Sequence, residues 1–348
     1  MTVAEQLRRA CASRILLTDG AYGTELQALG LGEADYRGGL AFDRDQKGNH
    51  DILALTRPDA IIGVTAAYLA AGADIVSTNT FSANRISQGD YGTAHLVRPI
   101  NIAAASLARG LADRYRHQDD RPRFVMGAVG PTNKTLSLSP DVNDPGHREI
   151  DFDTLTAVYV EQIDALAEGG VDFILVETIF DTLNAKAAIM ATRQVEQARG
   201  RALPLILSMT ITDLSGRNLS GHSVEAFWNC VRHADPLAVG LNCSFGAAQL
   251  RPHLKALSDA SDTLVIAYPN AGLPNEFGCY DEAPEDTAAQ VAQWVDAGIV
   301  NILGGCCGST PAHIAAIRDI AARHAPRRRP VLPPVTRLAG LESMVLPR

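Results

Sequence analysis

Five short apolar runs decide the fold of this chain: VDFILVETI (171–179), LPLILSMTI (203–211), PLAVGLNCS (236–244), LVIAYPNA (264–271) and IVNILGGCC (299–307). Their first residues are 28 to 35 positions apart, which leaves room for little more than one strand and one helix in each interval. A near-continuous apolar run is typical of a parallel strand that is covered on both faces. The spacing therefore predicts repeated strand–helix units.

The first half of the chain adds three more runs of the same kind: RILLTDGA (14–21), ADIVSTNT (73–80) and FVMGAVG (124–130). Helical patterns lie between the runs, for example at 57–72, 153–170, 225–234, 288–298 and 311–324. Longer insertions are predicted at 22–56, 81–122 and 131–152. Eight strands that alternate with helices predict a single (β/α)₈ barrel of the TIM type over residues 1–325.

An open, doubly wound sheet is the alternative architecture. Its usual dinucleotide-binding signature, GxGxxG at the first strand–helix turn, is absent, because that turn reads DGAYGTE (19–25). The last segment, 326–348, is rich in Pro and Arg and is predicted to be a tail or linker that leaves the barrel.

Composition narrows the class of protein. The chain of 348 residues has 46% hydrophobic residues and a net charge of −8, which excludes a largely disordered chain and argues against nucleic acid or an anionic membrane as the main partner. No signal peptide and no apolar run of membrane-spanning length is present in the sequence. We therefore expect a cytoplasmic protein whose six cysteines are free or metal-bound.

Three of the six cysteines follow directly on predicted strands. Cys243 is the second-last residue of the run at 236–244, and the adjacent Cys306 and Cys307 end the run at 299–307. In an α/β barrel the C-terminal ends of the strands meet on one face, which predicts that the three thiols lie together. Three thiolates favour zinc, and a zinc site with one open position is the usual catalytic form. The alternatives are buried inert cysteines and a redox pair.

Asp19 and Glu177 are carboxylates at the ends of the first and fourth predicted strands. They could bind an ammonium group, and the glycine-containing turn at 20–23 could bind a carboxylate through its backbone N–H groups. Zinc with three thiolates would stabilise a substrate thiol as thiolate, while the net negative charge of the site keeps that sulfur nucleophilic. These features predict alkyl transfer to the thiol of an amino acid. The alternatives are a helix N-cap or an Asx-turn for Asp19 and a buried Arg or Lys partner for Glu177.

Several stretches resemble the homocysteine S-methyltransferase family, and the resemblance runs over roughly residues 10–325: DGAYGTE (19–25), ADIVSTNTF (73–81), VETIFD (176–181), GLNCS (240–244) and GGCCGSTP (304–311). The stretches 127–155, 210–229 and 268–281 are similar to the N-terminal homocysteine-binding domain of cobalamin-dependent methionine synthase. Tyr22 differs from the small residue or Met that is more usual in the GAxGT turn.

The resemblance implies a (β/α)₈ barrel in which Cys243, Cys306 and Cys307 hold Zn²⁺ at the C-terminal ends of the strands. It also implies that Asn270 is a labile fourth ligand, which homocysteine displaces.

The substrate-binding residues follow from the same resemblance. Asp19 and Glu177 match the family positions that hold the amino group of homocysteine. We also predict Gly20, Ala21 and Asn79 as substrate-binding residues.

The implied activity is the methylation of homocysteine to methionine, in which the zinc thiolate takes the methyl group of methylcobalamin. Related full-length methionine synthases continue into folate and cobalamin modules, whereas this chain ends after its Pro-rich tail and has no DxHxxG motif. We therefore expect a split enzyme or an excised domain. In both cases a partner supplies methylcobalamin, and this chain does not bind it tightly by itself.

Two other functions remain open at this point. A homocysteine methyltransferase could use betaine or S-methylmethionine directly as the methyl donor. A different class of protein would be a non-catalytic subunit that binds zinc or senses thiols.

Overall fold

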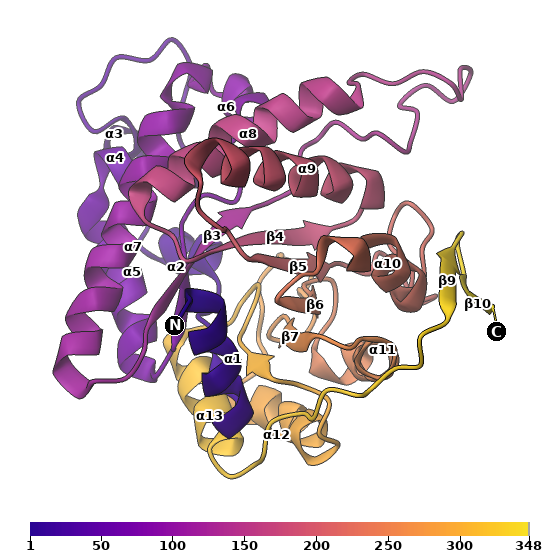
Figure 1. Ribbon diagram of the computed structural model, residues 1–348. Helices are drawn as coiled ribbons and strands as arrows, with labels where there is room; N and C mark the ends of the chain where they lie inside the picture. The colour runs from indigo at the N-terminus through magenta and orange to yellow at the C-terminus, as the bar shows by residue number, and fades with distance from the viewer. Residues whose placement is uncertain (347–348) are drawn as a thin grey trace.

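Eight parallel strands form a barrel in the computed structural model, which describes residues 1–346 (Figure 1). The strands are β1 (Leu16–Leu17), β2 (Ile75–Ser77), β3 (Phe124–Val129), β4 (Phe173–Ile179), β5 (Leu205–Met209), β6 (Ala238–Asn242), β7 (Leu264–Tyr268) and β8 (Ile302–Leu303). Each lies inside one of the eight apolar runs. The hydrogen-bonded order is β1-β8-β7-β6-β5-β4-β3-β2, and a bridge between Thr18 and Ile75 joins the two ends. The predicted (β/α)₈ barrel is confirmed, and it is nearly closed.

Helices surround the barrel and connect its strands. They are α1 (Val3–Ser13), α2 (Tyr22–Ala28), α3 (Glu33–Arg37), α4 (Leu53–Thr56), α5 (Pro58–Ala71), α6 (Arg85–Asp90), α7 (Val97–Asp119), α8 (Phe152–Gly169), α9 (Thr182–Arg199), α10 (Val224–Val231), α11 (Ala247–Ala260), α12 (Pro284–Asp296) and α13 (Pro311–Ala321). Side-chain caps define several starts, such as those of Asp151 on α8 and Asp181 on α9. The first insertion contains α2, α3 and α4, and the second contains α6 and α7.

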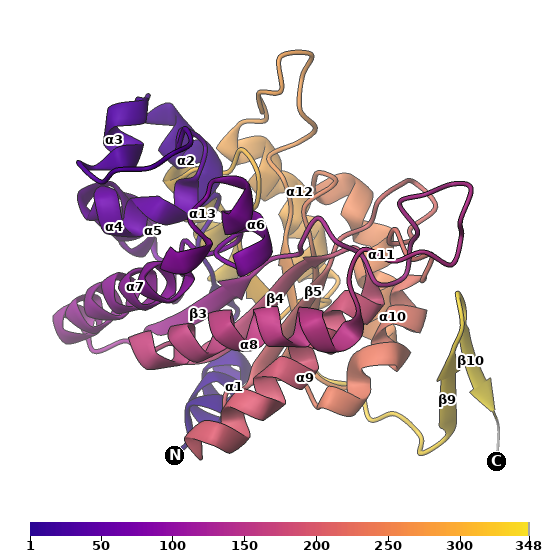
Figure 2. The same ribbon diagram turned by 90° about the horizontal axis from the view of Figure 1, so that it is seen from above.

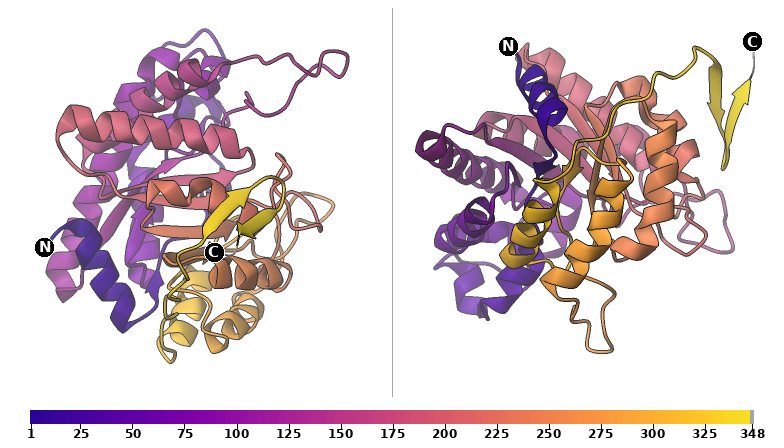
Figure 3. Two further views of the ribbon diagram at one scale, coloured as in Figure 1. Left: turned by 45° about the vertical axis from the view of Figure 1, so that its right-hand side comes forward. Right: turned by 90° about the horizontal axis from the view of Figure 1, so that it is seen from below.

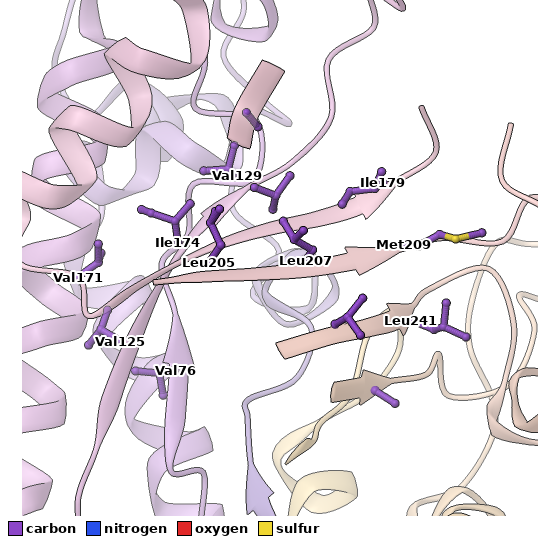
Figure 4. Packing of buried hydrophobic residues seen from close by; sticks show 14 of the residues in the cluster. Val76, Val125, Val129, Val171, Ile174, Ile179, Leu205, Leu207, Met209 and Leu241 are labelled. Carbon is purple, nitrogen blue, oxygen red and sulfur yellow. The ribbon is translucent and has the colours of Figure 1, made fainter. Parts of the chain in front are cut away.

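The core has two layers because neighbouring residues of a strand point to opposite sides of the barrel wall. The outer layer packs under the helices and includes Val76, Val125, Ile174, Leu205 and Leu207 (Figure 4). The inner layer fills the barrel and includes Ile75, Phe124, Phe173, Ile206 and Ile266, together with Leu7 and Cys11 of α1. Since Cys11 belongs to this inner core, it is remote from the chemistry of the strand ends, and burial raises the pKa of its thiol to about 12.

Asp74 connects the short strands β1 and β2 through buried polar contacts. Its carboxylate is fully buried and pairs with Arg14 and Arg121 at 2.7 Å each. It also accepts a hydrogen bond from the backbone N–H of Leu17 at 3.0 Å. Because β1 and β2 share few ladder hydrogen bonds, this buried group holds the first two strands in register.

The segment after α13 crosses the molecule and ends in a hairpin of β9 (Thr336–Ala339) and β10 (Ser343–Leu346) (Figure 3). The buried guanidinium of Arg327 binds the carbonyls of Ser258, Ser261 and Thr263. The hairpin lies beside α10 (Figure 2). The boundary between a domain of 1–325 and a tail of 326–348 stays a prediction, and residues 347–348 lie outside the described part.

Within residues 1–346, no single helix has the length and apolar composition needed to cross a membrane. Two helical segments, His50–Thr56 and Pro58–Ala71, pass that test only when taken together, and the chain bends by 110° between them.

Candidate active site

The three cysteines predicted to bind metal lie together at the C-terminal end of the barrel. The Sγ atom of Cys307 is 3.8 Å from that of Cys243 and 3.9 Å from that of Cys306. All three sulfur atoms lie within 4.8 Å of one another. None is in a disulfide, so the three thiols form one open cluster.

The end of β7 positions both cysteine-bearing turns. The carbonyl of Tyr268 accepts from the N–H of Cys243 at 3.3 Å, and that of Pro269 accepts from the N–H of Cys306 at 2.7 Å. The N–H of Asn270 donates to the carbonyl of Phe245 at 3.1 Å. Cys243 has a positive φ of 61°, a conformation that costs energy outside glycine and is common at functional sites. The strand end thus fixes the thiols relative to one another.

The donor set fits a zinc ion. Tetrahedral zinc with sulfur at about 2.3 Å requires sulfur–sulfur separations of about 3.8 Å, and Cys307 is at 3.8 and 3.9 Å from the other two sulfur atoms. Hydrogen bonds from Cys243 and Cys306 lower the pKa of Cys307, so one thiolate is favoured even before a cation binds. The amide oxygen of Asn270 is buried and has no hydrogen-bond partner among the described residues. An unpaired oxygen on the segment that pins the cysteines is the kind of group that could complete a fourth position.

Asp19 lies at the end of β1 and is 4% exposed. Its carboxylate accepts from the N–H of Ser77 at 2.5 Å, from the Ser77 hydroxyl at 3.1 Å and from the Thr18 hydroxyl at 2.9 Å. The alternative of a helix cap is wrong, because α2 begins after Ala21 without a side-chain cap. Burial raises the pKa of Asp19 to about 6, although these hydrogen bonds oppose the shift.

Glu177 lies on β4 and faces the same cavity as Asp19. Burial raises the pKa of Glu177 to about 8, and the charges of Asp19 and Cys307 add to the shift. Glu177 is partly buried, and its exposed surface lines the cavity. No Arg or Lys pairs with it in residues 1–346, so the alternative of a buried cationic partner is not observed.

The backbone after Glu177 is held in an unusual conformation. Thr178 has a positive φ of 54°, which is rare for a β-branched residue. The side chain of Asn242 stabilises it, because its Oδ1 accepts from the N–H of Thr178 at 3.1 Å and its Nδ2 donates to the Thr178 hydroxyl at 2.8 Å. Asn242 precedes Cys243, so one buried amide couples the position of the carboxyl to that of the thiol.

A cavity of about 570 Å³ joins these groups. Its wall includes eight of the nine residues predicted for the site: Asp19, Gly20, Ala21, Asn79, Glu177, Cys243, Cys306 and Cys307. Asn270 is not a lining residue, although its backbone N–H binds the turn that follows Cys243. Asn79 donates through Nδ2 to the carbonyl of His50 at 2.7 Å, and the N–H of Ala21 donates to the Ser309 hydroxyl at 3.3 Å.

Sequence reasoning missed several residues of the cavity. Tyr268 lines it and has a buried hydroxyl without a hydrogen-bond partner in the described part of the chain. This hydroxyl lies near the Glu177 carboxyl and slightly lowers the pKa of that carboxyl. The two groups do not have the geometry of a hydrogen bond. Tyr280 does not line the cavity, but it packs against Gly308 beside Cys307, where a Cβ atom would overlap the tyrosine side chain. The only available signal was that both tyrosines lie in the stretch 268–281.

Asp51 is a further missed residue, and it leads to a pH-dependent prediction. Burial raises the pKa of Asp51 to about 7. Because the folded state binds this proton more tightly than the unfolded state, the contribution of Asp51 to the free energy of unfolding falls as the pH rises from about 4 to about 7. The free energy of unfolding of Asp51→Asn, taken relative to that of the wild type, should therefore increase by about 3 kcal/mol between these pH values. Urea unfolding at several pH values measures this, and a constant difference would contradict it.

Comparison with known proteins shows which family the chain belongs to. A family model described as homocysteine S-methyltransferase matches residues 16–321. The metallated form of the homocysteine methyltransferase MmuM from Escherichia coli superposes with a TM-score of 0.69 at 23% identity, over 91% of this chain and 98% of that one. The oxidized form of the same enzyme superposes with a TM-score of 0.69 at 23% identity, over 88% of this chain and 95% of that one. At this identity the structures establish a shared fold. The family match spans most of the chain, and the chain therefore belongs to the homocysteine S-methyltransferase family.

Proposed function

We propose that this protein methylates the thiol of homocysteine to form methionine, and that methylcobalamin carried by a separate chain or domain is the methyl donor. The observation that carries the proposal is the meeting of three thiols and two cation-free carboxyls in one cavity. Membership of the family supports the methyl acceptor. The donor rests on the sequence similarity to the methionine synthase branch.

The residues have separate tasks in this proposal. Cys243, Cys306 and Cys307 would hold Zn²⁺, with the amide oxygen of Asn270 in the fourth position. When bound there, zinc supplies the positive charge that stabilises the substrate sulfur as thiolate at neutral pH. The protein itself orients the amino acid, because the carboxyls of Asp19 and Glu177 bind its ammonium group.

Glu177 also handles a proton in this arrangement. In the empty cavity its pKa of about 8 favours the protonated form at neutral pH. An ammonium group beside it would lower that pKa and favour the carboxylate. Substrate binding then releases a proton from Glu177, and the resulting ion pair is enclosed by the barrel end.

Metal dependence tests the proposal. We expect methyl transfer from methylcobalamin to homocysteine to fall in proportion to zinc content when a chelator removes the metal, and to return when zinc is added back. Activity that persists after complete zinc removal would contradict the metal role. Turnover with betaine or S-methylmethionine, and none with methylcobalamin, would instead support a small onium donor. A tightly closed four-ligand zinc with no homocysteine binding would support the non-catalytic class.

The zinc coordination gives an independent prediction. We expect X-ray absorption at the zinc edge to show three sulfur ligands and one oxygen ligand in the free protein. Addition of homocysteine should replace the oxygen by sulfur. In Asn270→Ala a water replaces the protein-derived oxygen, so the zinc–oxygen distance in the free protein should change while the homocysteine complex remains like that of the wild type. An unchanged spectrum in free Asn270→Ala would contradict the ligand role of Asn270.

A further inference from the structure

The inner face of the barrel changes from apolar to polar at the C-terminal strand ends. Apolar side chains of the inner core fill the barrel below this point. Because every second residue of a strand points inward, the inward positions that follow are Glu177 on β4, Ser208 on β5, Asn242 on β6 and Tyr268 on β7. Four polar groups therefore form one layer above the core, and buried polar groups of this kind are normally paired by hydrogen bonds.

Tyr268 is the exception in this polar layer. The hydroxyl of Ser208 donates to Oδ1 of Asn242 at 2.7 Å, and the same amide binds Thr178. Tyr268 is only 5% exposed, yet its hydroxyl has no hydrogen-bond partner within residues 1–346. An orphaned hydroxyl in the interior costs stability, so the group calls for an explanation.

The hydroxyl of Tyr268 lies among acidic groups. Burial raises the pKa of Tyr268 well above its usual value, and the charges of Glu177, Cys306 and Asp19 add to the shift. All four residues line the same cavity. Tyr268 therefore keeps its proton at neutral pH and can donate one hydrogen bond, for which a carboxylate is the strongest acceptor nearby.

Among these acidic groups, Glu177 has hydrogen-bonding capacity to spare. Asp19 already accepts three hydrogen bonds from its neighbours, and Cys306 belongs to the thiol cluster. The carboxyl of Glu177 lies near the hydroxyl of Tyr268 without the geometry of a hydrogen bond, and the exposed surface of Glu177 lines the cavity. One carboxyl oxygen can therefore accept from Tyr268 while the other accepts from a ligand.

We propose that Tyr268 is a positioning residue for the methyl acceptor, and that its hydroxyl donates to Glu177 when the ammonium group of homocysteine binds the other oxygen of that carboxyl. This hydrogen bond is absent from the empty cavity and forms with the substrate. The carboxylate then has a charge-assisted hydrogen bond on each side, one to the phenol and one to the ammonium group. The inference rests on the proposed function, because it concerns how the same acceptor is held.

The stability of the empty protein distinguishes this role from a structural one. Tyr268→Phe removes a hydroxyl that makes no hydrogen bond in the empty cavity. We therefore expect its thermal midpoint without ligand to equal or exceed that of the wild type. Tyr115→Phe is the control, because the Tyr115 hydroxyl donates to the carbonyl of Ala66 at 3.1 Å and does not line the cavity. A midpoint of Tyr268→Phe that falls as far as that of the control would overturn a hydrogen bond formed only with substrate.

Ligand binding should show the opposite effect. Methionine, the proposed product, carries the ammonium group without a free thiol, and isothermal titration calorimetry measures its binding. Tyr268→Phe should bind methionine roughly tenfold more weakly than the wild type, and Tyr115→Phe should bind it equally well. KM for homocysteine should rise by the same factor with little change in kcat. With 4-mercaptobutanoate, which is homocysteine without its amino group, KM should stay unchanged.

A double-mutant cycle tests whether Tyr268 acts through Glu177. In the background of Glu177→Gln the carboxylate acceptor is missing, so the further change Tyr268→Phe should alter KM for homocysteine by less than about twofold. Multiplication of the two single effects would show that the residues act independently, and it would overturn the link between them.

The outcomes separate this inference from the proposed function. Equal losses with homocysteine and with 4-mercaptobutanoate would overturn the positioning role, while methyl transfer by the wild type would still support the function. Unchanged methionine binding and KM in Tyr268→Phe would overturn the inference in the same way. Weakened methionine binding in Tyr268→Phe, together with a wild type that transfers no methyl group, would support the inference and contradict the function. Absence of both methionine binding and methyl transfer in the wild type would overturn both.

Discussion

Replacing Cys243 with serine is expected to lower kcat/KM for homocysteine methylation by roughly a thousandfold or more, because it removes one of three thiolates on which the metal depends. Zinc content of the purified protein should fall in parallel. The Sγ of Cys243 lies 3.8 Å from that of Cys307, so its loss leaves the remaining pair unable to enclose an ion on three sides. Serine has the same backbone requirements at the positive φ of this residue, and the substitution therefore isolates the contribution of sulfur.

The fold should survive this substitution. Both layers of the core consist of apolar side chains that do not include Cys243 or Cys307. The far-UV circular dichroism spectrum and the thermal midpoint of Cys243→Ser should therefore stay close to those of the wild type. Cys230→Ser is the control, because Cys230 is a half-buried cysteine of α10 outside the cavity. Unfolding of Cys243→Ser beside a normal Cys230→Ser would indicate a structural zinc and would favour the non-catalytic alternative.

The strands and the thiol cluster could be predicted from sequence for a simple physical reason. A buried parallel strand needs a continuous apolar run, and barrel closure then places the residues that follow every run on one face. Cys243, Cys306 and Cys307 are brought together by this rule alone. Helix α8 was predictable for a related reason, because it carries both a helical period and a cap.

The parts that escaped prediction depend on contacts between distant segments. The link between Thr178 and Asn242 joins two strands across the barrel end, and neither residue is marked by periodicity. Asp51 is buried only because the insertion folds back so that Ser82 and Gln88 cover it. The hairpin of β9 and β10 lies in the segment predicted to be a tail, because its Pro-rich composition gives no signal for two four-residue strands.

Replacing Glu177 with glutamine is expected to raise KM for homocysteine by roughly a hundredfold, because a charge-assisted hydrogen bond to the ammonium group is worth about 1.5–3 kcal/mol. The turnover number should change little, since the ammonium group carries the same charge before and during methyl transfer. Glutamine retains the size of the side chain and removes the carboxyl whose pKa is raised to about 8. Zinc content should be unchanged, which separates this variant from Cys243→Ser.

A thiol acid that lacks the amino group tests whether Glu177 binds the ammonium group of homocysteine. With 4-mercaptobutanoate as acceptor, the wild type and Glu177→Gln should have similar KM values, because the interaction that the substitution removes is already missing from the substrate. Asp19→Asn should also raise the KM for homocysteine. It should in addition distort β2, since Asp19 accepts two hydrogen bonds from Ser77. If Glu177→Gln impairs both acceptors equally, Glu177 does not bind the ammonium group. Its role would then be electrostatic, through the interaction between its carboxyl and the charge of Cys307.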